Sequence, residues 1–390
     1  MNIAIFNAEA RKAVSVIRSL GEEGLKIISF SFERISFAGS SRYVHKNFYL
    51  KDFDTEYITK KLKSCEIDMI LPIEDSSIEF FGKNKDRFKK YRIIMPEFET
   101  FILFADKANT VRLAKEKGVS VPETYIPDST EEAEKNLLAR SDYPLVIKPR
   151  RSTGSIGLKI VKDPKEGTRN YRMLSEKFHL PLIQQYIPQG GKALGAEFLF
   201  FRGREIMSFS HQRIREFPVN NGPSTFCKYY RKDDALTKGR KFFEGLNYSG
   251  FAMVEFKEHP ETKELYLMEI NPRPWGSITL PISMGFNFPA EAVKVFWDPE
   301  NYEIQEPGLD IDLSQDYYMR WFLPGDLLSI SLNKRMTVTE KFRKLFRKYK
   351  NTAYQILSLK DPLPALTMIL KLALNLFNFG YIRKYLLRRW

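Results

Sequence analysis

Cysteine and histidine are scarce in this sequence of 390 residues. The two cysteines, Cys65 and Cys227, exclude a disulfide framework, and no CxxC pair is present that would indicate a zinc site. The four histidines are scattered along the chain, which argues against a histidine-rich metal centre. The first residues, MNIAIFNAEARK, lack the apolar run of a signal peptide, so we expect a protein of the reducing cytoplasm.

Two glycine-rich nucleotide motifs are also missing. The first predicted strand, MNIAIF, is followed by NAEA instead of GxGxxG, and the GK[ST] of a P-loop does not follow the later glycine-rich loop. The apolar runs MNIAIF, LKIISFSF and IDMILPIED alternate with helical segments, which predicts a parallel, Rossmann-like sheet over residues 1–96. Hairpin patterns dominate residues 97–300, so the expected fold class is α/β followed by α+β.

The net charge of +14 is concentrated at one end of the chain. Residues 341–390 contain twelve Lys or Arg and one acid, Asp361, whereas residues 1–340 are nearly balanced. KFRKLFRKYK interleaves basic and aromatic residues, and an apolar run with a narrow polar stripe follows it. We therefore predict a helical, basic region at 301–390 that lies on an anionic membrane surface. A helix docked on the protein's own core is the alternative, and nucleic acid is disfavoured because no binding motif is present.

The stretch YLMEINPRPWGS, residues 266–277, contains polar side chains at alternate positions. Glu269, Asn271 and Arg273 would face the same side of an extended strand. The segment AMVEFK is predicted to pair with this strand in a hairpin, which makes Glu255 a cross-strand neighbour of Glu269. Two adjacent carboxylates and an amide oxygen suit Mg²⁺, which prefers hard oxygen ligands. A solvated hairpin face with lysine partners is the alternative.

A lysine and a glycine-rich loop form a second candidate element. Lys148 ends the apolar strand in VIKP, and STGSIG follows at residues 152–157, where small residues let backbone N–H groups approach a phosphate. A lysine that extends its ammonium to water, next to an ordinary turn, explains these features equally well. In HQRIREF, Arg213 and Arg215 share strand parity, so they would both face the site or both belong to an exposed charged strand.

Together these segments resemble the ATP-grasp superfamily, in the carboxylate–amine ligase branch that is similar to carbamoyl phosphate synthetase and biotin carboxylase domains. The resemblance spans about residues 1–300 in the order DK, VIKP, glycine-rich loop, QQYIP, VEF and EINPR. It implies a Rossmann-like pre-ATP-grasp domain at 1–96 and an ATP-grasp domain at 97–300. A mobile lid is expected at about 119–184, and the helical, basic region occupies 301–390.

The resemblance also implies a role for each matched position. The expected ATP-binding residues are Lys107, Lys148, Ser152, Thr153, Gly154, Ser155, Gly157, Gln184, Gln185 and Ile187. The expected ligands of Mg²⁺ or Mn²⁺ are Glu255, Glu269 and Asn271, and the expected catalytic residues are Arg273 and Arg215. Two features depart from the family pattern: Gln185 replaces the usual hinge glutamate, and Glu197 is only a candidate for the acid that binds ribose.

The implied activity is that of an ADP-forming ligase, which activates a carboxylate as an acyl phosphate and joins it to an amine. A C-terminal helix that begins with DPLP resembles members of cell-envelope and surface-polysaccharide assembly, and suggests peripheral contact with the inner face of the cell membrane. An ATP-grasp kinase or carboxylase and a non-catalytic membrane-binding scaffold are the alternatives. The sequence specifies neither the two substrates nor the oligomeric state.

Overall fold

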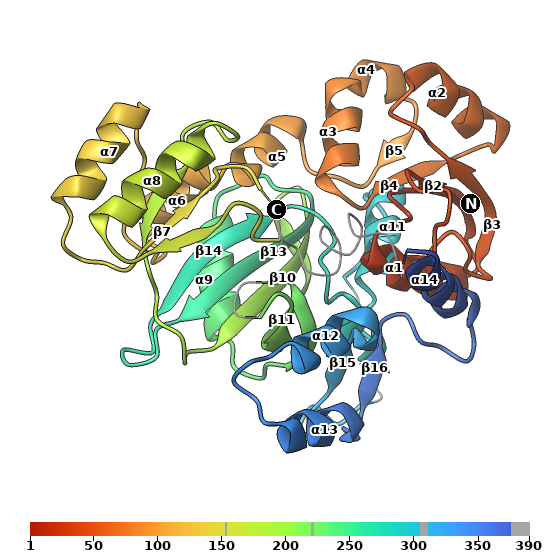
Figure 1. The fold of residues 1–390 in the computed structure, drawn as a ribbon. Helices are drawn as coiled ribbons and strands as arrows, with labels where there is room; N and C mark the ends of the chain where they lie inside the picture. Colours follow the sequence, from red (N-terminus) through yellow and green to blue (C-terminus); the bar gives the residue numbers. More distant parts are fainter. Residues whose placement is uncertain (153, 220–221, 305–310, 376–390) are drawn as a thin grey trace.

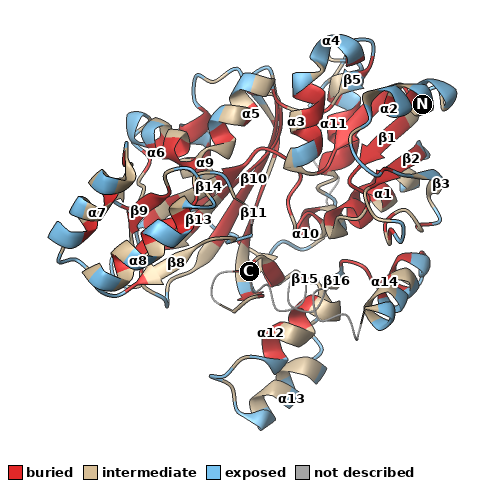
Figure 2. Ribbon diagram, turned by 45° about the horizontal axis from the view of Figure 1, so that its top comes forward, coloured by how far each residue is buried: buried red, intermediate tan, exposed pale blue. Residues whose placement is uncertain are grey.

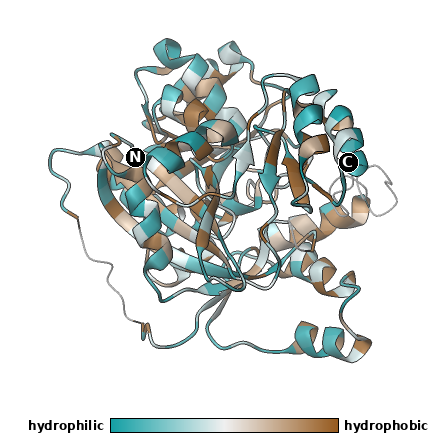
Figure 3. Ribbon diagram, turned by 90° about the vertical axis from the view of Figure 1, so that its left-hand side faces the viewer, coloured by the Kyte–Doolittle hydropathy of each residue, from teal (hydrophilic) through white to brown (hydrophobic). Residues whose placement is uncertain are grey.

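The computed structural model describes residues 1–152, 154–219, 222–304 and 311–375. Figure 1 shows three β-sheets: one near the N-terminus, a large one in the middle, and a small one at the far side from the N-terminus. Their strand orders are β3-β2-β1-β4-β5, β14-β13-β10-β11-β12-β15-β16 and β6-β9-β7-β8. Figure 2 shows that the central strands are buried, and in Figure 3 hydrophilic residues predominate on the outer helices.

The first sheet is entirely parallel, as the alternation of apolar runs and helices predicts. Its strands are β1 Asn2–Phe6, β2 Lys26–Ser31, β3 Val44–Tyr49, β4 Met69–Pro72 and β5 Arg92–Ile93. The accompanying helices are α1 Arg11–Glu22, α2 Thr55–Ser64, α3 Asp75–Lys83 and α4 Lys85–Phe88. Isoleucine, valine and phenylalanine side chains fill cores on both faces, because a parallel sheet with crossover helices is covered on each side. The carboxyl end of β4 consequently positions the acids that begin α3.

The central sheet contains the two predicted hairpins, and all its pairs are antiparallel except β15 with β16. Its strands are β10 Ala193–Phe201, β11 Arg204–Glu216, β12 Ser224–Tyr229, β13 Gly250–Glu258, β14 Leu265–Asn271, β15 Tyr318–Arg320 and β16 Thr352–Tyr354. α5 Phe98–Ala105, α6 Lys107–Glu116 and α9 Asp234–Phe243 pack near it, and α10 Thr279–Ser283 and α11 Phe288–Trp297 join it to α1. β15 and β16 belong to the region that the sequence predicts as helical, so this part of the prediction is wrong.

The small sheet forms a separate layer with its own core. It comprises β6 Thr124–Tyr125, β7 Leu145–Lys148, β8 Lys159–Val161 and β9 Leu182–Gln185, and it packs against α7 Thr130–Ala139 and α8 Pro164–Ser175. β7 and β8 are antiparallel across the glycine-rich loop, as the sequence predicts. In Figure 1 this layer projects over β13 and β14, so a cleft between the layers is the natural place for a ligand.

The C-terminal elements are short: the π-helical turn η1 Phe322–Asp326 and the helices α12 Leu327–Ser331, α13 Val338–Phe346 and α14 Leu363–Leu374. α14 packs beside the first sheet, where Thr367 donates a hydrogen bond to Ser40 and Lys371 forms an ion pair with Glu33. For residues 363–374 the docked helix is therefore the better interpretation, although one side of the helix is exposed. None of the helices in the described ranges is long and apolar enough to cross a membrane. The part of the predicted membrane segment after residue 375 lies outside the described residues.

Candidate functional site

Two carboxylates and an amide meet at the end of the β13–β14 hairpin. Glu255 and Glu269 are direct cross-strand partners, as the sequence predicts. The Asn271 side chain lies within 3.3 Å of Glu255 Oε1 and within 3.3 Å of Glu269 Oε1. Two carboxylates held this close repel each other unless a cation or a hydrogen-bond donor lies between them. The arrangement is therefore a preformed place for positive charge.

Each carboxylate also contacts a basic side chain on its outer side. Arg213 Nη2 lies 2.5 Å from Glu255 Oε2, and Lys107 Nζ lies 3.4 Å from Glu269 Oε2. Burial opposes ionisation of Glu269, but the positive charges of Lys107 and Lys148 lower the pKa of its carboxyl. Glu269 therefore has negative charge available, and the Oε1 atoms of both acids accept from the Asn271 amide.

The donor set fits a hard divalent cation. No group of three His, Cys, Asp or Glu side chains is arranged around one point in the described residues, so the candidate ligands are Glu255, Glu269 and the Asn271 amide. Asn271 now donates from Nδ2 to both acids, while its Oδ1 accepts from Arg273. Rotation of the amide by half a turn would present an oxygen to a metal, which matches the ligand preference of Mg²⁺.

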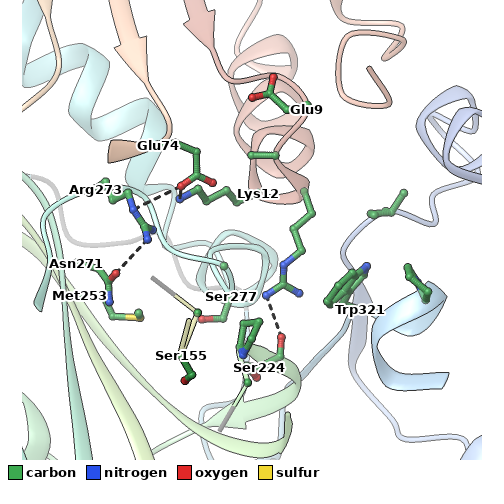
Figure 4. Close-up of a pocket in the computed structure, with 18 of the residues that line it drawn as sticks. Glu9, Lys12, Glu74, Ser155, Ser224, Met253, Asn271, Arg273, Ser277 and Trp321 are labelled. Atoms are coloured by element: carbon green, nitrogen blue, oxygen red, sulfur yellow. Dashed lines mark hydrogen bonds and ion pairs between the residues drawn. The ribbon is translucent and has the colours of Figure 1, made fainter. Parts of the chain in front are cut away.

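Arg273 is positioned by residues of the first sheet. Its Nε lies 2.7 Å from Asp75 Oδ1 and 3.6 Å from Glu74 Oε2, and its Nη2 donates to Asn271 Oδ1 at 3.1 Å. Lys12 is bonded to Glu74 at 3.0 Å on the other side, and Figure 4 shows this row of side chains along the cavity wall. Burial and the charge of Arg273 lower the pKa of Lys12 to about 8. The carboxyl end of β4 thus orients the arginine.

A narrow cleft of about 190 Å³ lies between the small sheet and the β13–β14 hairpin. Its lining includes the predicted residues Lys107, Lys148, Ser152, Ser155, Gln184, Gln185 and Ile187 together with Glu255 and Glu269. Lys148 is 5 % exposed and donates to the carbonyl of Met268 at 3.3 Å. Burial and the ammonium of Lys107 lower the pKa of Lys148 to about 7, although Glu269 opposes the effect. A buried cation without a carboxylate bonded to it is suited to an anionic ligand.

The glycine-rich loop covers one end of this cleft. Ser152 accepts a hydrogen bond from Lys107 through its carbonyl at 2.7 Å, and Ser155 borders both this cleft and a larger cavity. Gly154 and Gly157 have positive φ angles of 61° and 78°, which glycine adopts without strain. Thr153 lies outside the described residues. The loop therefore lies beside Lys107 and Lys148, where it could cover phosphate groups bound in the cleft.

The predicted adenine-contacting segment also lines the cleft. Gln184 Nε2 donates to Thr124 Oγ1 at 2.7 Å, and the backbone N–H of Gln185 donates to Glu123 at 2.8 Å. The carbonyl of Ile187 accepts from Lys257 at 2.7 Å. These bonds place β9 against β6 and fix the rim of the cleft, while adenine binding here remains a prediction.

A larger cavity of about 540 Å³ begins at Glu255 and Glu269 and extends away from the cleft. Arg11, Phe37 and Ser277 line it with the C-terminal residues Trp321, Pro324, Ile356, Met368, Lys371 and Leu372. Figure 4 shows Ser277 and Trp321 facing this space from different parts of the chain. The carboxylate pair therefore lies between a cleft suited to a nucleotide and a cavity large enough for a second molecule.

Residues 104–277 match the family model of the ATP-grasp domain. This part of the chain is an ATP-grasp domain. The match contains the cleft, the carboxylate pair and the glycine-rich loop, and it ends at Ser277. The resemblance that the sequence motifs indicate is thus confirmed at the level of the domain family.

Sequence and structure comparisons agree on the ATP-grasp fold. The D-alanine–D-alanine ligase of Helicobacter pylori strain P12 is 23 % identical over 236 residues, which cover 54 % of this chain and 64 % of the ligase. A probable alpha-L-glutamate ligase of Syntrophotalea carbinolica is 24 % identical over 216 residues, or 53 % of this chain and 69 % of that ligase. The chain thus spans a little under two thirds of the H. pylori ligase.

Two solved structures illustrate the shared fold. The biotin carboxylase domain of Hydrogenobacter thermophilus 2-oxoglutarate carboxylase, solved with MgADP, ADP and bicarbonate, aligns with a TM-score of 0.66 and 18 % identity. The alignment covers 81 % of this chain and 73 % of that one. N5-carboxyaminoimidazole synthetase of Staphylococcus aureus aligns with a TM-score of 0.64, 17 % identity and 81 % coverage of both chains.

Two expected ATP-grasp residues are not where the sequence placed them. Arg215 lies outside the lining of both cavities and forms a buried ion pair with Asp326, at 2.6 Å. The pairing register of β11 shifts between Arg213 and Arg215, so strand parity no longer puts them on the same face. Glu197 is completely buried and bonded to His211, which excludes it from the ribose end of the cleft.

The ATP-grasp site also contains residues that sequence reasoning missed. Asp75 is 198 positions from Arg273, which it contacts, and Lys12 is 262 positions from Pro274, to whose carbonyl it donates. These separations are too large for any local sequence pattern to link the residues. IDMILPIED indicates a buried strand that ends in carboxylates, which is the available signal for Asp75. The sequence predicts the same environment for Arg213 and Arg215. In the structure Arg213 contacts Glu255 at the site, whereas Arg215 contacts Asp326.

Proposed function

We propose that the chain is an ADP-forming ligase that uses ATP with Mg²⁺ or Mn²⁺ to join a carboxylate to an amine. The observation that carries this proposal is the position of Glu255, Glu269 and Asn271 between the lysine-lined cleft and the larger cavity. We further propose the domain division 1–96, 97–300 with a lid at about 119–184, and 301–390. The relatives' names support a ligase, and their substrates suggest amino acids for the first assays.

The residues of the site suit the two parts of such a reaction. A metal ion held by Glu255, Glu269 and Asn271 would offset the charge of the ATP phosphates, which is the chief requirement of phosphoryl transfer. Lys107 and Lys148 would hold the phosphates from the cleft side, and Arg273 would hold the activated carboxyl group from the cavity side. The loop at 152–157 would exclude water, because water would hydrolyse an acyl phosphate.

A screen for ADP release would test this proposal. Purified full-length protein would be incubated with Mg-ATP and with pairs from panels of carboxylates and amines, beginning with D-alanine and L-glutamate. ADP, free phosphate and a new amide detected by mass spectrometry would support the ligase. ADP with a stable phosphorylated product would indicate a kinase, and dependence on bicarbonate would indicate a carboxylase. Tight ATP binding without turnover in any combination would favour a non-catalytic role and contradict the ligase.

We also propose that the chain contacts an anionic membrane surface through α13. No residue of α13 is buried, and Val338, Phe342 and Phe346 are 83 %, 65 % and 67 % exposed on one side of the helix. The Phe342 and Phe346 rings lie 4.5 Å apart, and Lys341 and Arg343 are close by in the sequence. Apolar rings flanked by cations suit the interface of an anionic bilayer. Such contact would bring the enzyme to substrates of cell-envelope or surface-polysaccharide assembly.

Liposome sedimentation would test the membrane proposal with a matched control. The full-length protein should sediment with phosphatidylserine vesicles more than with phosphatidylcholine vesicles, and salt should weaken the binding without abolishing it. Phe342→Ser should reduce binding, whereas Leu138→Ser, which removes a 60 % exposed leucine from α7, should not. Equal sedimentation of the two variants, or no binding of the unmodified protein, would contradict a role for α13.

A further inference from the structure

A carboxylate, an imidazole and a hydroxyl form a buried row that ends at the larger cavity. Glu197 on β10 is bonded to His211 Nδ1 on β11, and His211 Nε2 lies 3.4 Å from the Ser277 hydroxyl. The exposed fractions of the three residues are 0 %, 1 % and 3 %. Ser277 lines the cavity between Asn271 and Ser224 (Figure 4). None of these side chains has a role in the ATP chemistry proposed above.

The local sequence makes space for this row. Gly195 is the register partner of His211 across the β10–β11 pair. A Cβ atom at position 195 would lie 2.4 Å from His211 Cε1 and 2.9 Å from Glu197 Oε1, closer than any side chain tolerates. Glycine here therefore leaves room for the imidazole beside β10, where it contacts both Glu197 and Ser277. The tight fit fixes the orientation of the ring.

The hydrogen bonds define the direction in which a proton can move. In the tautomer in which the Glu197 carboxylate accepts from Nδ1, Nε2 of His211 is the acceptor for the Ser277 hydroxyl. Burial raises the pKa of Glu197, while the neighbouring His211 and Arg213 oppose this effect. Cys227 is also nearby, but burial and the charge of Glu197 raise the pKa of its thiol to about 12. Ser277 is thus the end of the row that faces the cavity.

The proposed ligation needs a proton acceptor at this position. An amine is largely protonated at neutral pH, so its nitrogen must lose one proton before it can attack and a second proton as the amide forms. The described carboxylates that line the cavity are all engaged: Glu9, Glu33, Glu74, Glu255 and Glu269 each accept from a backbone N–H or contact a basic side chain. These partners occupy carboxylate oxygens that would otherwise be free to take a proton from an amine.

We infer that Ser277, supported by His211 and Glu197, accepts the proton of the attacking amine in the second half of the ligation. The amine nitrogen forms a bond to the acyl carbon, and the bond from that carbon to the phosphate oxygen breaks with departure of phosphate. Before this attack the ammonium proton passes to Ser277 Oγ as the hydroxyl proton of Ser277 moves to His211 Nε2, and during it the second nitrogen proton leaves with the departing phosphate. Glu197 then stabilises the imidazolium. This inference rests on the proposed function, which supplies the acyl phosphate.

A substrate-free experiment measures whether Ser277 is activated. Diisopropyl fluorophosphate would be added to the full-length protein, and the modified residue would be located by peptide mass spectrometry. Attack by Ser277 Oγ on phosphorus expels fluoride and transfers the hydroxyl proton to His211, which is the same proton movement. We expect a single adduct on Ser277 and a labelling rate about a hundredfold lower in His211→Gln and in Glu197→Gln. Ser224→Ala, a change of another serine in the same cavity, should leave the rate of Ser277 labelling unchanged.

The outcomes separate a proton relay from a buried structural network. An unlabelled Ser277 in the unmodified protein would overturn the inference, and this measurement does not depend on any variant being folded. Equal labelling of Ser277 in the unmodified protein and in a folded His211→Gln variant would also overturn it. Failure of every carboxylate and amine to release ADP would contradict the proposed function but would leave the labelling result unaffected.

A second measurement applies to a carboxylate that proves active in the ADP screen. Hydroxylamine is largely unprotonated at neutral pH and needs little help from a base. Ser277→Ala should therefore keep hydroxylamine-dependent hydroxamate formation near the unmodified rate while the amine-dependent rate falls about a hundredfold. A parallel fall in both rates would show that Ser277 shapes the cavity and does not accept the proton, which would overturn the assignment.

Discussion

Replacement of Lys148 by methionine tests whether the cleft binds the phosphates of ATP. The side chain is 5 % exposed, and its pKa falls from 10.5 to about 7 because of burial and the charge of Lys107. A fall of this size means that charging the amine at this buried position costs on the order of 5 kcal/mol. An anionic phosphate would offset that cost, so ATP binding and protonation of Lys148 should be coupled.

The expected loss of affinity follows from the type of contact removed. A hydrogen bond between an ammonium and a phosphate contributes about 1.5–3 kcal/mol, which corresponds to a loss of about tenfold to a hundredfold in ATP affinity. Methionine has a similar length and no charge, so unfolding in urea should show that Lys148→Met is no less stable than the unmodified protein. Titration calorimetry with Mg-ATP would measure the affinity directly.

Lys159 supplies the matched control for this experiment. It lies on β8, as the register partner of Ile147, on the other side of the same glycine-rich loop. The residue is only half-buried and is not part of the cleft lining, so Lys159→Met should change ATP affinity by about threefold or less. Equal losses in the two variants would refute the assignment of Lys148 and would leave the loop as a simple hairpin turn.

Three further predictions concern the site and its surroundings. Glu269→Gln should reduce ADP release by about a thousandfold or more in a folded protein, because it removes one metal-binding carboxylate; near-normal turnover would contradict the metal assignment. ATP affinity should be full below pH 7 and should weaken by up to about tenfold per pH unit above it, as Lys148 loses its proton; calorimetry in two buffers should detect proton uptake above pH 7. Arg215→Met should lower the free energy of unfolding by about 3 kcal/mol by weakening the buried pair with Asp326, with ATP affinity unchanged; loss of affinity without loss of stability would restore Arg215 to the site.

The part of the site that local pairing creates could be predicted from the sequence. Glu255 and Glu269 become neighbours because a hairpin sets their register, and Asn271 follows two residues later on the same side. Alternation along a strand is a property of the backbone, so it can be read without knowledge of the rest of the fold. Strands β1, β2 and β4 of the parallel sheet are also predictable, because each is a continuous apolar run.

Contacts between distant segments could not be predicted. Arg273 is oriented by Asp75, almost two hundred residues earlier, and no periodicity links these positions. Arg215 lies away from the site because the pairing of β11 with β12 shifts register on both sides of this residue, which cancels the alternation on which the prediction depends. The sequence of α14 does not decide whether the helix packs on the protein or on a membrane, because an apolar helix with a narrow polar stripe suits a protein surface as well as a bilayer.

α14 contributes to the lining of the larger cavity but not to that of the cleft. The cleft that we assign to ATP takes no described residue beyond Glu269, whereas the larger cavity takes Trp321, Met368 and Lys371 from the C-terminal segment. Asp361, two residues before α14, forms an ion pair with Arg18 at 2.9 Å. Substitutions in the C-terminal segment are therefore expected to alter which molecule fits the larger cavity, while the cleft proposed for ATP keeps its lining.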